Sequence, residues 1–195
     1  MLDAIRIKYL QNRIACHDDQ WAYKELFRSF YSGLFSFAGN FIKSRQAAEE
    51  VVSDVFIRIW EKRRDLEKID NLKVYLFVAV RNKSLNYLDK QKRMPTECLD
   101  ETSSSIPCIS FDPEQIMITA EMVQRIEMAI ASLPLQCRTI FRLVKEEKLQ
   151  YREVAEILQI SAKTVENQLA IAVRKIGTAI QFDIRRSIPA SFGNS

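Results

Sequence analysis

Apolar residues recur three and four positions apart along most of this chain, which is the spacing of one face of an α-helix. The spacing predicts helices over residues 2–15, 20–43, 46–64, 72–93, 114–132 and 135–147, and then two shorter helices joined by a turn. Asp18 and Asp19 are expected to start the second helix and Asn71 the fourth, because short polar side chains accept hydrogen bonds from first-turn amides. The pattern therefore predicts an all-α protein.

The two shorter helices lie within residues 149–175 and are joined by the turn Gln159-Ile160-Ser161. Each carries one apolar face, made of Val154, Ala155 and Leu158 in the first helix and of Val165, Leu169 and Ala172 in the second. Ser161 is a good N-cap, because its hydroxyl can accept from an amide at the start of the second helix.

That second helix begins with polar residues directed away from its apolar face: Lys163, Thr164, Glu166, Asn167 and Gln168. A polar helix N-terminus held out from a small core is what a helix-turn-helix presents to the major groove of DNA. An ordinary helical hairpin in a bundle has the same outline. The small Ala155, the cap Ser161 and the pair Thr164-Val165 favour the DNA-binding interpretation.

The helical pattern is interrupted at residues 94–113, which hold three of the five prolines and a Ser/Thr cluster. Such a segment predicts a linker, since it has no helical period and is rich in helix-breaking residues. We expect two small helical domains, residues 1–93 and 114–186, joined by a flexible linker and followed by a frayed tail, 187–195. The second domain contains the helix-turn-helix.

Composition allows a core and excludes several kinds of site. Hydrophobic residues make up 47% of the chain, and the net charge is only +4. The cysteines Cys16, Cys98, Cys108 and Cys137 form no C-x-x-C pair, and the chain has only one histidine, His17. No zinc site or other cofactor is therefore expected. Scattered cysteines without a signal peptide indicate the cytoplasm, and no apolar run approaches the roughly 18 residues of a transmembrane helix.

Charge is segregated between two neighbouring predicted helices. Residues 46–61 carry the acids Glu49, Glu50, Asp54 and Glu61 against one base, Arg58. Residues 73–93 carry the bases Lys73, Arg81, Lys83, Lys90, Lys92 and Arg93 against one acid, Asp89. Two solvated faces that balance each other would give the same pattern.

The basic helix differs from an ordinary solvated face because aromatic residues, Tyr75, Phe77 and Tyr87, are interleaved with its bases. Cations that follow phosphates and rings that stack on bases suit single-stranded nucleic acid. The alternative is that these rings belong to the core. Tyr75 and Phe77 cannot both face inward, so at least one of them is available for binding.

Five stretches in this order match a known family. The charged helices contain Ala48-Glu-Glu-Val-Val-Ser-Asp-Val-Phe-Ile-Arg-Ile-Trp-Glu-Lys and Tyr75-Leu-Phe-Val-Ala-Val-Arg-Asn-Lys-Ser-Leu-Asn-Tyr-Leu-Asp, and Ser132-Leu-Pro, Tyr151-Arg-Glu-Val-Ala and Ser161-Ala-Lys-Thr-Val-Glu follow. In order and spacing, from residue 18 to residue 186, they resemble the small bacterial sigma factors of the extracytoplasmic-function (ECF) group. The resemblance implies a protein without catalysis that binds core RNA polymerase and directs promoter-specific transcription initiation.

The resemblance implies that the acidic helix docks on the clamp coiled coil of the polymerase's largest subunit. Asp54 and Phe56 match the family's Asp-x-Phe pattern, with Asp54 as a polar contact and Phe56 as core. The expected polymerase-binding residues are Glu49, Glu50, Asp54, Arg58 and Trp60.

For the basic helix, the resemblance implies melting and reading of the minus-ten promoter element. Asn82 matches a family asparagine, Tyr75 stands where tryptophan is usual, and the loop 69–73 matches one that holds a flipped-out base. The expected minus-ten residues are Asn71, Lys73, Tyr75, Asn82, Lys83, Asn86 and Lys90.

The helix-turn-helix would read the minus-thirty-five element as duplex DNA. The expected contacts are Arg152, Lys163, Thr164, Glu166, Asn167, Gln168, Arg174 and Lys175. Ala170, Ile171 and Val173 depart from the bulky or basic residues of many relatives, so Asn167 and its neighbours would carry recognition. Lys148 replaces a glycine often found before the motif.

The family also implies a membrane-anchored anti-sigma partner, although the chain is not expected to insert into a membrane itself. A stand-alone helix-turn-helix regulator would explain residues 149–175 but would leave the basic aromatic helix without a purpose. Only such a regulator would bind duplex DNA tightly in a gel shift without polymerase. An enzyme is disfavoured, because the chain has one histidine, no glycine-rich phosphate loop and no carboxylate–histidine constellation.

Overall fold

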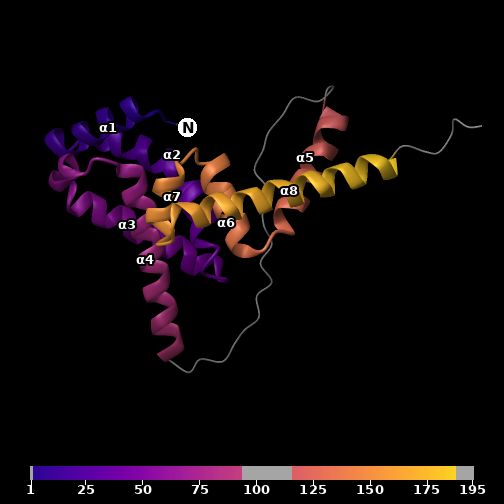
Figure 1. Ribbon diagram of the computed structural model, residues 1–195. Helices are drawn as coiled ribbons and strands as arrows, with labels where there is room; N and C mark the ends of the chain where they lie inside the picture. Colours follow the sequence, from indigo (N-terminus) through magenta and orange to yellow (C-terminus); the bar gives the residue numbers. More distant parts are fainter. Residues whose placement is uncertain (1, 94–115, 188–195) are drawn as a thin grey trace, which may run out of the picture. The chain divides into compact units, whose positions relative to one another are not determined.

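The computed structural model describes residues 2–93 and 116–187, and the regular elements within them are all helices, as the sequence predicts. The elements, in chain order, are α1 (Ala4–His17), α2 (Gln20–Ala38), α3 (Arg45–Glu61), the 3-10 helix η1 (Arg63–Lys68), α4 (Leu72–Arg93), α5 (Ile116–Ala131), α6 (Leu135–Lys145), α7 (Tyr151–Leu158) and α8 (Ala162–Ser187) (Figure 1). The predicted linker 94–113 lies outside the described residues, as does the predicted tail apart from its first residue.

The described helices divide into two compact units. The first unit contains α1, α2, α3, η1 and α4, and the second contains α5, α6, α8 and most of α7. The predicted pair of helical domains is therefore confirmed, while the domain boundaries at residues 93 and 114 stay predictions.

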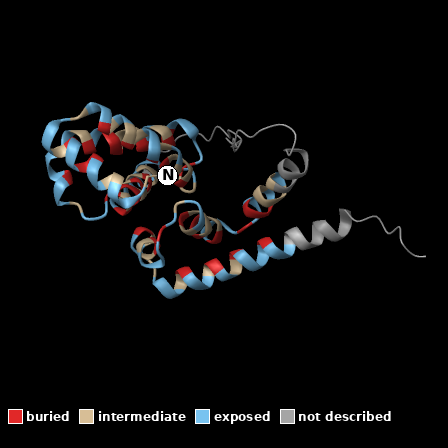
Figure 2. Cartoon of the chain, turned by 90° about the horizontal axis from the view of Figure 1, so that it is seen from above, coloured by how far each residue is buried: buried red, intermediate tan, exposed pale blue. Residues whose placement is uncertain are grey.

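In the first unit, α2 packs against α1, α3 and α4, so its apolar face forms the centre of the core. Leu26 and Leu34 of α2 are fully buried together with Phe56 of α3 and Phe77 of α4. The rings of Phe37 and Phe77 meet edge to face with centroids 5.2 Å apart. Figure 2 shows how buried positions line the inner faces of these helices.

Side chains mark the helix starts where the sequence predicts them. Asp19 Oδ1 accepts from the Trp21 and Ala22 amides at 2.9 and 3.1 Å, and Asn71 Oδ1 accepts from the Val74 amide at 3.1 Å. The prediction for Asp18 is wrong, because Asp18 ends α1 in a left-handed conformation with φ 52°.

Two element boundaries also differ from prediction. Helix α2 ends at Ala38, directly before Gly39 and Asn40, two residues with low helix propensity. Helix α3 ends at Glu61, and the chain continues as η1, which the periodicity did not reveal. One short 3-10 turn with one buried residue, Leu66, gives no repeating apolar signal.

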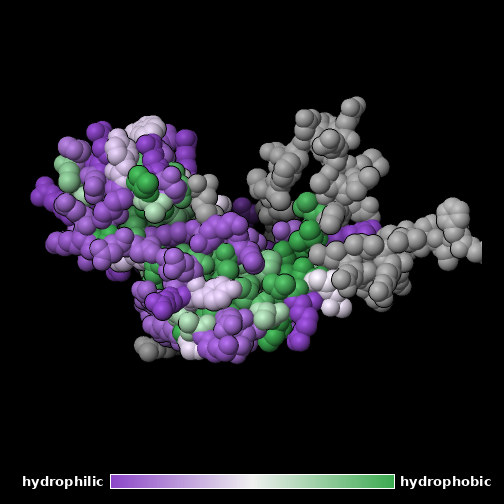
Figure 3. Space-filling view, turned by 45° about the horizontal axis from the view of Figure 1, so that its top comes forward, coloured by the Kyte–Doolittle hydropathy of each residue, from purple (hydrophilic) through white to green (hydrophobic). Residues whose placement is uncertain are grey.

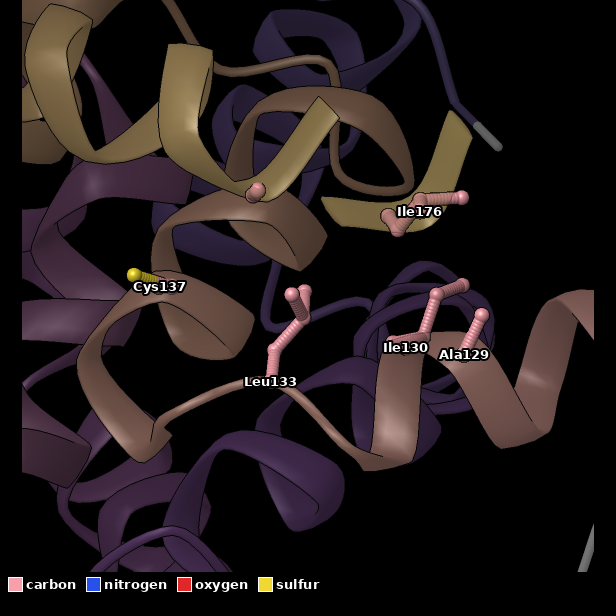
Figure 4. Packing of buried hydrophobic residues seen from close by; sticks show 6 residues of the cluster. Ala129, Ile130, Leu133, Cys137 and Ile176 are labelled. Carbon is pink, nitrogen blue, oxygen red and sulfur yellow. The ribbon is translucent and has the colours of Figure 1, made fainter. Parts of the chain in front are cut away.

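The second unit is built around α8, which packs against α5 and α6. A cluster of small and aliphatic side chains fills their contact: Ala129, Ile130, Leu133, Cys137, Ala172 and Ile176. Figure 4 shows Ile176 of α8 facing Ala129 and Ile130 of α5.

Helices α7 and α8 form the predicted helix-turn-helix. Val154, Val165 and Leu169 are buried as expected, but Ile157 is the second fully buried residue of α7, while Ala155 and Leu158 are half-buried. Ser161 Oγ accepts from the Thr164 amide at 3.0 Å, which confirms the predicted N-cap.

Candidate nucleic-acid and protein interfaces

The acidic helix α3 buries one face and exposes the other. Ser44 caps it by accepting from the Ala47 amide at 3.4 Å. Its buried residues are Ala47, Ala48, Val51, Val52, Val55, Phe56 and Ile59, so Phe56 is core as predicted. Among the predicted polymerase contacts, Glu50 and Arg58 are exposed, and Glu49, Asp54 and Trp60 are half-buried.

An apolar residue that the sequence reasoning missed lies on this charged face. Ile57 is 54% exposed, next to Arg58, although its neighbours Phe56 and Ile59 are buried. The signal was available, because Ile57 lies about 180° around the helix from the buried Ala48 and therefore opposite the buried face. The space-filling view in Figure 3 shows hydrophobic patches among mainly hydrophilic residues on the face in view.

Trp60 is held at the end of α3 by its neighbours. The Arg63 guanidinium lies 4.9 Å from its ring centroid, and the Tyr23 ring lies 4.9 Å away. Tyr23 also donates from its hydroxyl to the Phe56 carbonyl at 3.0 Å, and burial raises the pKa of Tyr23. This fixes a wide aromatic surface beside the charged face of α3.

The basic helix α4 presents a stripe of exposed side chains. Tyr75 is 44% exposed while Phe77 is fully buried, so the expectation that at least one of them is available is met. Asn82, Asn86 and Lys90 are exposed, and the successive intervals from Tyr75 through them are seven, four and four residues. At about 100° per residue these four side chains share one side of the helix.

Two other predicted minus-ten residues are less available: Lys73 lies on another side of α4, and Lys83 is engaged in an ion pair. Lys73 is two positions from Tyr75, which is about 200° around the helix and therefore near its opposite side. Lys83 is half-buried and its Nζ forms an ion pair with Asp54 Oδ2 of α3. The structure thus joins a residue predicted to bind polymerase to one predicted to bind DNA, which local patterns did not indicate.

In the helix-turn-helix, the first turns of α8 expose the central predicted residues. Lys163, Glu166 and Asn167 are exposed, and Lys163 Nζ pairs with Glu166 Oε2 at 2.8 Å. Arg174 follows Asn167 by seven residues, so Lys163, Asn167 and Arg174 share one outward stripe. Arg152 and Lys175 are exposed as well.

The outward placement predicted for Gln168 is wrong, and Thr164 is only partly outward. Gln168 is half-buried, and its Oε1 accepts from the Cys137 thiol of α6, with Sγ and Oε1 2.7 Å apart. It lies about 60° from Val165 around the helix, close to the buried face. Thr164 is half-buried, and its Oγ1 lies 2.8 Å from Ser161 Oγ.

Lys148 takes a left-handed backbone conformation with φ 57° just before α7. This is the position where the sequence departs from the glycine of many relatives. Glycine adopts such a conformation without a steric penalty, which explains the family's preference.

Within residues 2–93 and 116–187, no group of three or more His, Cys, Asp and Glu side chains is arranged to hold a metal ion. In the same residues no helix is both long enough and apolar enough to cross a membrane.

Comparison with known protein families accounts for both units. Sigma-70 region 2 matches residues 26–94, and Sigma-70 region 4 matches residues 123–176, so the two together cover more than half of the chain. The chain belongs to the sigma-70 family. Its helix-turn-helix is region 4 of a sigma factor, which disfavours a stand-alone regulator, because such a regulator would have no use for region 2.

Relatives place the chain in the ECF group of that family. It is 26% identical over 176 residues to the ECF RNA polymerase sigma-E factor of Escherichia coli K12, which covers 86% of this chain and 91% of the relative. It is 23% identical over 171 residues to the RNA polymerase sigma-H factor of Pseudomonas aeruginosa, with coverages of 84% and 88%. This ECF sigma factor therefore directs RNA polymerase to promoters, and sigma factors as a class are initiation factors without enzymatic activity.

Solved structures share the fold at low sequence identity. The sigma factor RpoE of Bartonella quintana, solved with the anti-sigma factor NepR, aligns with a TM-score of 0.60 and 20% identity over 83% of this chain and 98% of that chain. CnrH, solved with the cytosolic domain of CnrY, aligns with a TM-score of 0.54 and 19% identity over 91% and 99%.

Proposed function

We propose that the two units divide the work of promoter recognition. The first unit docks on core RNA polymerase through the exposed face of α3 and melts the minus-ten element along α4. The second unit reads the minus-thirty-five element with the first turns of α8. The observation that carries the proposal is the exposed stripe of Tyr75, Asn82, Asn86 and Lys90 on a helix whose other aromatic, Phe77, is buried.

That stripe suits single-stranded DNA chemically. An exposed tyrosine ring offers a stacking platform worth about 1–3 kcal/mol per base. This offsets the cost of a few kcal/mol for unstacking a base from the duplex. The amides of Asn82 and Asn86 can read the exposed edges of bases, and Lys90 can follow the phosphates.

The face of α3 suits a protein partner. Glu50 and Arg58 supply exposed charges of opposite sign, which orient an encounter, and Ile57 supplies apolar area between them. Half-buried Asp54 takes part in docking while it is paired with Lys83. The partner surface would carry complementary charge around an apolar contact.

The stripe of α8 suits duplex DNA. Asn167 can bond an adenine edge with two hydrogen bonds, and Arg174 and Lys163 can neutralise phosphates. Glu166 can accept from cytosine, while Gln168 contributes through whatever part of its amide the Cys137 contact leaves exposed.

Matched variants in transcription with reconstituted holoenzyme test the assignment. Asn82→Ala should reduce permanganate reactivity of melted minus-ten thymines about tenfold, while binding of core polymerase in a pull-down titration stays unchanged. The double variant Glu50→Ala with Asp54→Ala should instead weaken binding of core polymerase, while the complexes that still form melt the minus-ten element as the parent does. Gln91→Ala is the control, because Gln91 is exposed on α4 about 160° from Tyr75. Equal loss of duplex binding and melting in Asn82→Ala would reduce that residue to a phosphate contact.

We further propose that the protein has no catalysis of its own and acts in the bacterial cytoplasm. We also propose that an anti-sigma factor controls it, because one structural relative is solved with an anti-sigma factor and the other with the cytosolic domain of CnrY. A native pull-down with the full chain tests this. The expected result is a co-purifying protein that core polymerase displaces in competition.

A further inference from the structure

Helix α1 lies outside the residues that match region 2, yet it packs against η1 and α4. It therefore touches the segment that leads into the predicted minus-ten helix. Asp3 caps α1 by accepting from the Arg6 amide at 2.6 Å, and Leu10 and Ile14 bury its inner face. The helix is thus a fixed part of the first unit.

One polar residue of α1 is completely buried. Gln11 is 1% exposed, and its Nε2 donates both to the Leu66 carbonyl and to the Ile69 carbonyl, the latter at 2.7 Å. Both protons of the amide are used in this way. A buried amide with two backbone acceptors holds those acceptors in place, because moving either would leave a buried polar group unpaired.

The carbonyls that Gln11 holds belong to the end of η1 and the loop before α4. The Ile69 amide donates to the Leu66 carbonyl at 3.0 Å, so Gln11 joins both ends of the last 3-10 turn. Lys8 adds longer contacts from Nζ to the carbonyls of Glu67 and Ile69, at 3.4 and 3.5 Å. Leu66 anchors the turn in the core.

This held turn sets the position of the exposed residues that follow it. Asp70 and Asn71 are exposed, and Asn71 caps α4 through its Oδ1. A pocket that discriminates between bases needs its groups held to within about 0.5 Å by supporting side chains. Within the described residues, α1 supplies this support from behind the loop.

We infer that Gln11 is a positioning residue for promoter reading: its amide sets the backbone of residues 66–69 and thereby the geometry in which Asp70 and Asn71 meet a minus-ten base. The inference rests on the minus-ten reading that we propose for the first unit, extended here to the loop 69–73, which the resemblance matches to a loop that holds a flipped-out base. Gln11 itself touches no DNA.

The test is transcription by reconstituted holoenzyme from a promoter library randomised across both elements. Gln11→Met removes both donors and keeps the length of the side chain. It should flatten base preference at one minus-ten position about tenfold and leave the minus-thirty-five preference unchanged. Asn12→Ala, an exposed amide at the adjacent position, is the matched control and should behave as the parent.

A second control separates positioning from lost stability. Ile14→Val removes buried volume from α1 without touching a hydrogen bond. Amide hydrogen exchange over residues 66–74 should accelerate at least tenfold more in Gln11→Met than in Ile14→Val. If both variants change all promoter positions and all exchange rates alike, Gln11 has only a structural role and the inference is overturned.

Asn71→Ala distinguishes the inference from the function it rests on. If Asn71→Ala loses preference at one minus-ten position and Gln11→Met does not, the loop reads DNA without help from α1, and the inference is wrong. If Asn71→Ala also keeps every preference, the loop is no reader, and the proposed function of this loop fails together with the inference.

Discussion

The first unit links its two predicted surfaces directly to each other, whereas the second unit carries nearly all of its predicted contacts on α8, where Gln168 reaches Cys137 of α6, a residue with no predicted role. Asp54 of α3 pairs with Lys83 of α4, and Gln11 of α1 holds the loop before α4. In α8, Lys163 pairs with Glu166 only three residues away. Changes in the first unit should therefore spread between its surfaces, while changes in the second should stay at one position.

The two cores also differ in the side chains that fill them. The first unit joins aromatic rings from several helices, with Phe27 and Phe56 4.7 Å apart and Phe37 and Phe77 5.2 Å apart. The described cluster of the second unit buries small and aliphatic side chains and one thiol, and the one ring packed against it, that of Phe141, is only partly buried. A large ring shared by several helices makes the first unit more vulnerable to a single truncation.

Removing such a ring should have the largest effect on the stability of one unit relative to the other. Phe56→Ala should lower the free energy of unfolding of the first unit by about 3–5 kcal/mol, since it deletes a fully buried ring that contacts Phe27 and Tyr23. Ile140→Ala is the counterpart in the second unit, with a loss of about 2–5 kcal/mol. Denaturation followed by residue-resolved hydrogen exchange should confine each loss to its own unit. A shared loss would show that the units fold as one.

Promoter selection sharpens the local character of the second unit. Asn167→Ala should cost about 1–3 kcal/mol at one minus-thirty-five position and change the selected sequence, because it removes a base-edge contact. Arg174→Ala should weaken all sequences alike and flatten the salt dependence, since it removes a phosphate contact. An unchanged minus-thirty-five motif for Asn167→Ala would contradict the stripe described for α8.

Left-handed residues give a smaller test. Lys148→Gly should stabilise the second unit by about 0.5–1 kcal/mol, because glycine adopts φ 57° without a steric penalty. Ala170→Gly, at an exposed position in the interior of α8, should instead destabilise it by about 1 kcal/mol. In the first unit, Asp18→Gly should gain less than Lys148→Gly, because it also removes the ion pair of Asp18 with Arg63. Thermal denaturation measures all three.

The smallest expected effect is an opposite response to acid. Hydrogen bonds from the Ala22 amide and Arg13 lower the pKa of Asp19, and the Arg6 side chain lowers the pKa of Glu25. Their contribution to the first unit is present above the unfolded values near 4 and is lost as the pH falls through the lowered pKa values. Glu25→Gln should remove part of this dependence in urea titrations at several pH values.

In the second unit, partial desolvation raises the pKa of Glu146, whose side chain is still 49% exposed, although Arg142 opposes the shift. The corresponding stability is fully present below the unfolded value near 4 and is lost as the pH rises through the raised pKa. Mild acid should therefore strengthen the second unit before it weakens the first, and Glu146→Gln should abolish the gain. A parallel response of both units would contradict this difference.

Local patterns predict most of the helices and their caps, because periodicity and capping depend on residues within one or two turns. Asp19, Asn71 and Ser161 cap the helices that the sequence assigns to them. The exposed stripe of α4 and the first turns of α8 also follow from spacing alone.

The cross-links that shape the candidate sites could not be predicted in this way. Asp54 and Lys83 are 29 residues apart, Cys137 and Gln168 are 31 apart, and Gln11 and Leu66 are 55 apart. Such pairs leave no period in the sequence, since they depend on how whole helices pack. The polarity of Gln168 predicts an outward position, because local spacing does not show that the Cys137 thiol of α6 lies within hydrogen-bonding distance of it.

Both tryptophans of the chain, Trp21 and Trp60, belong to the first unit, so the second unit has no indole. Trp21 is 63% exposed, with the Arg6 guanidinium 5.7 Å from its ring, while Trp60 is half-buried beside Arg63 and Tyr23. Selective excitation of the intrinsic fluorescence therefore observes one half of the molecule without any label. With Trp21→Phe the remaining emission comes from the end of α3 alone, and it gives an optical signal for titrating polymerase onto that helix.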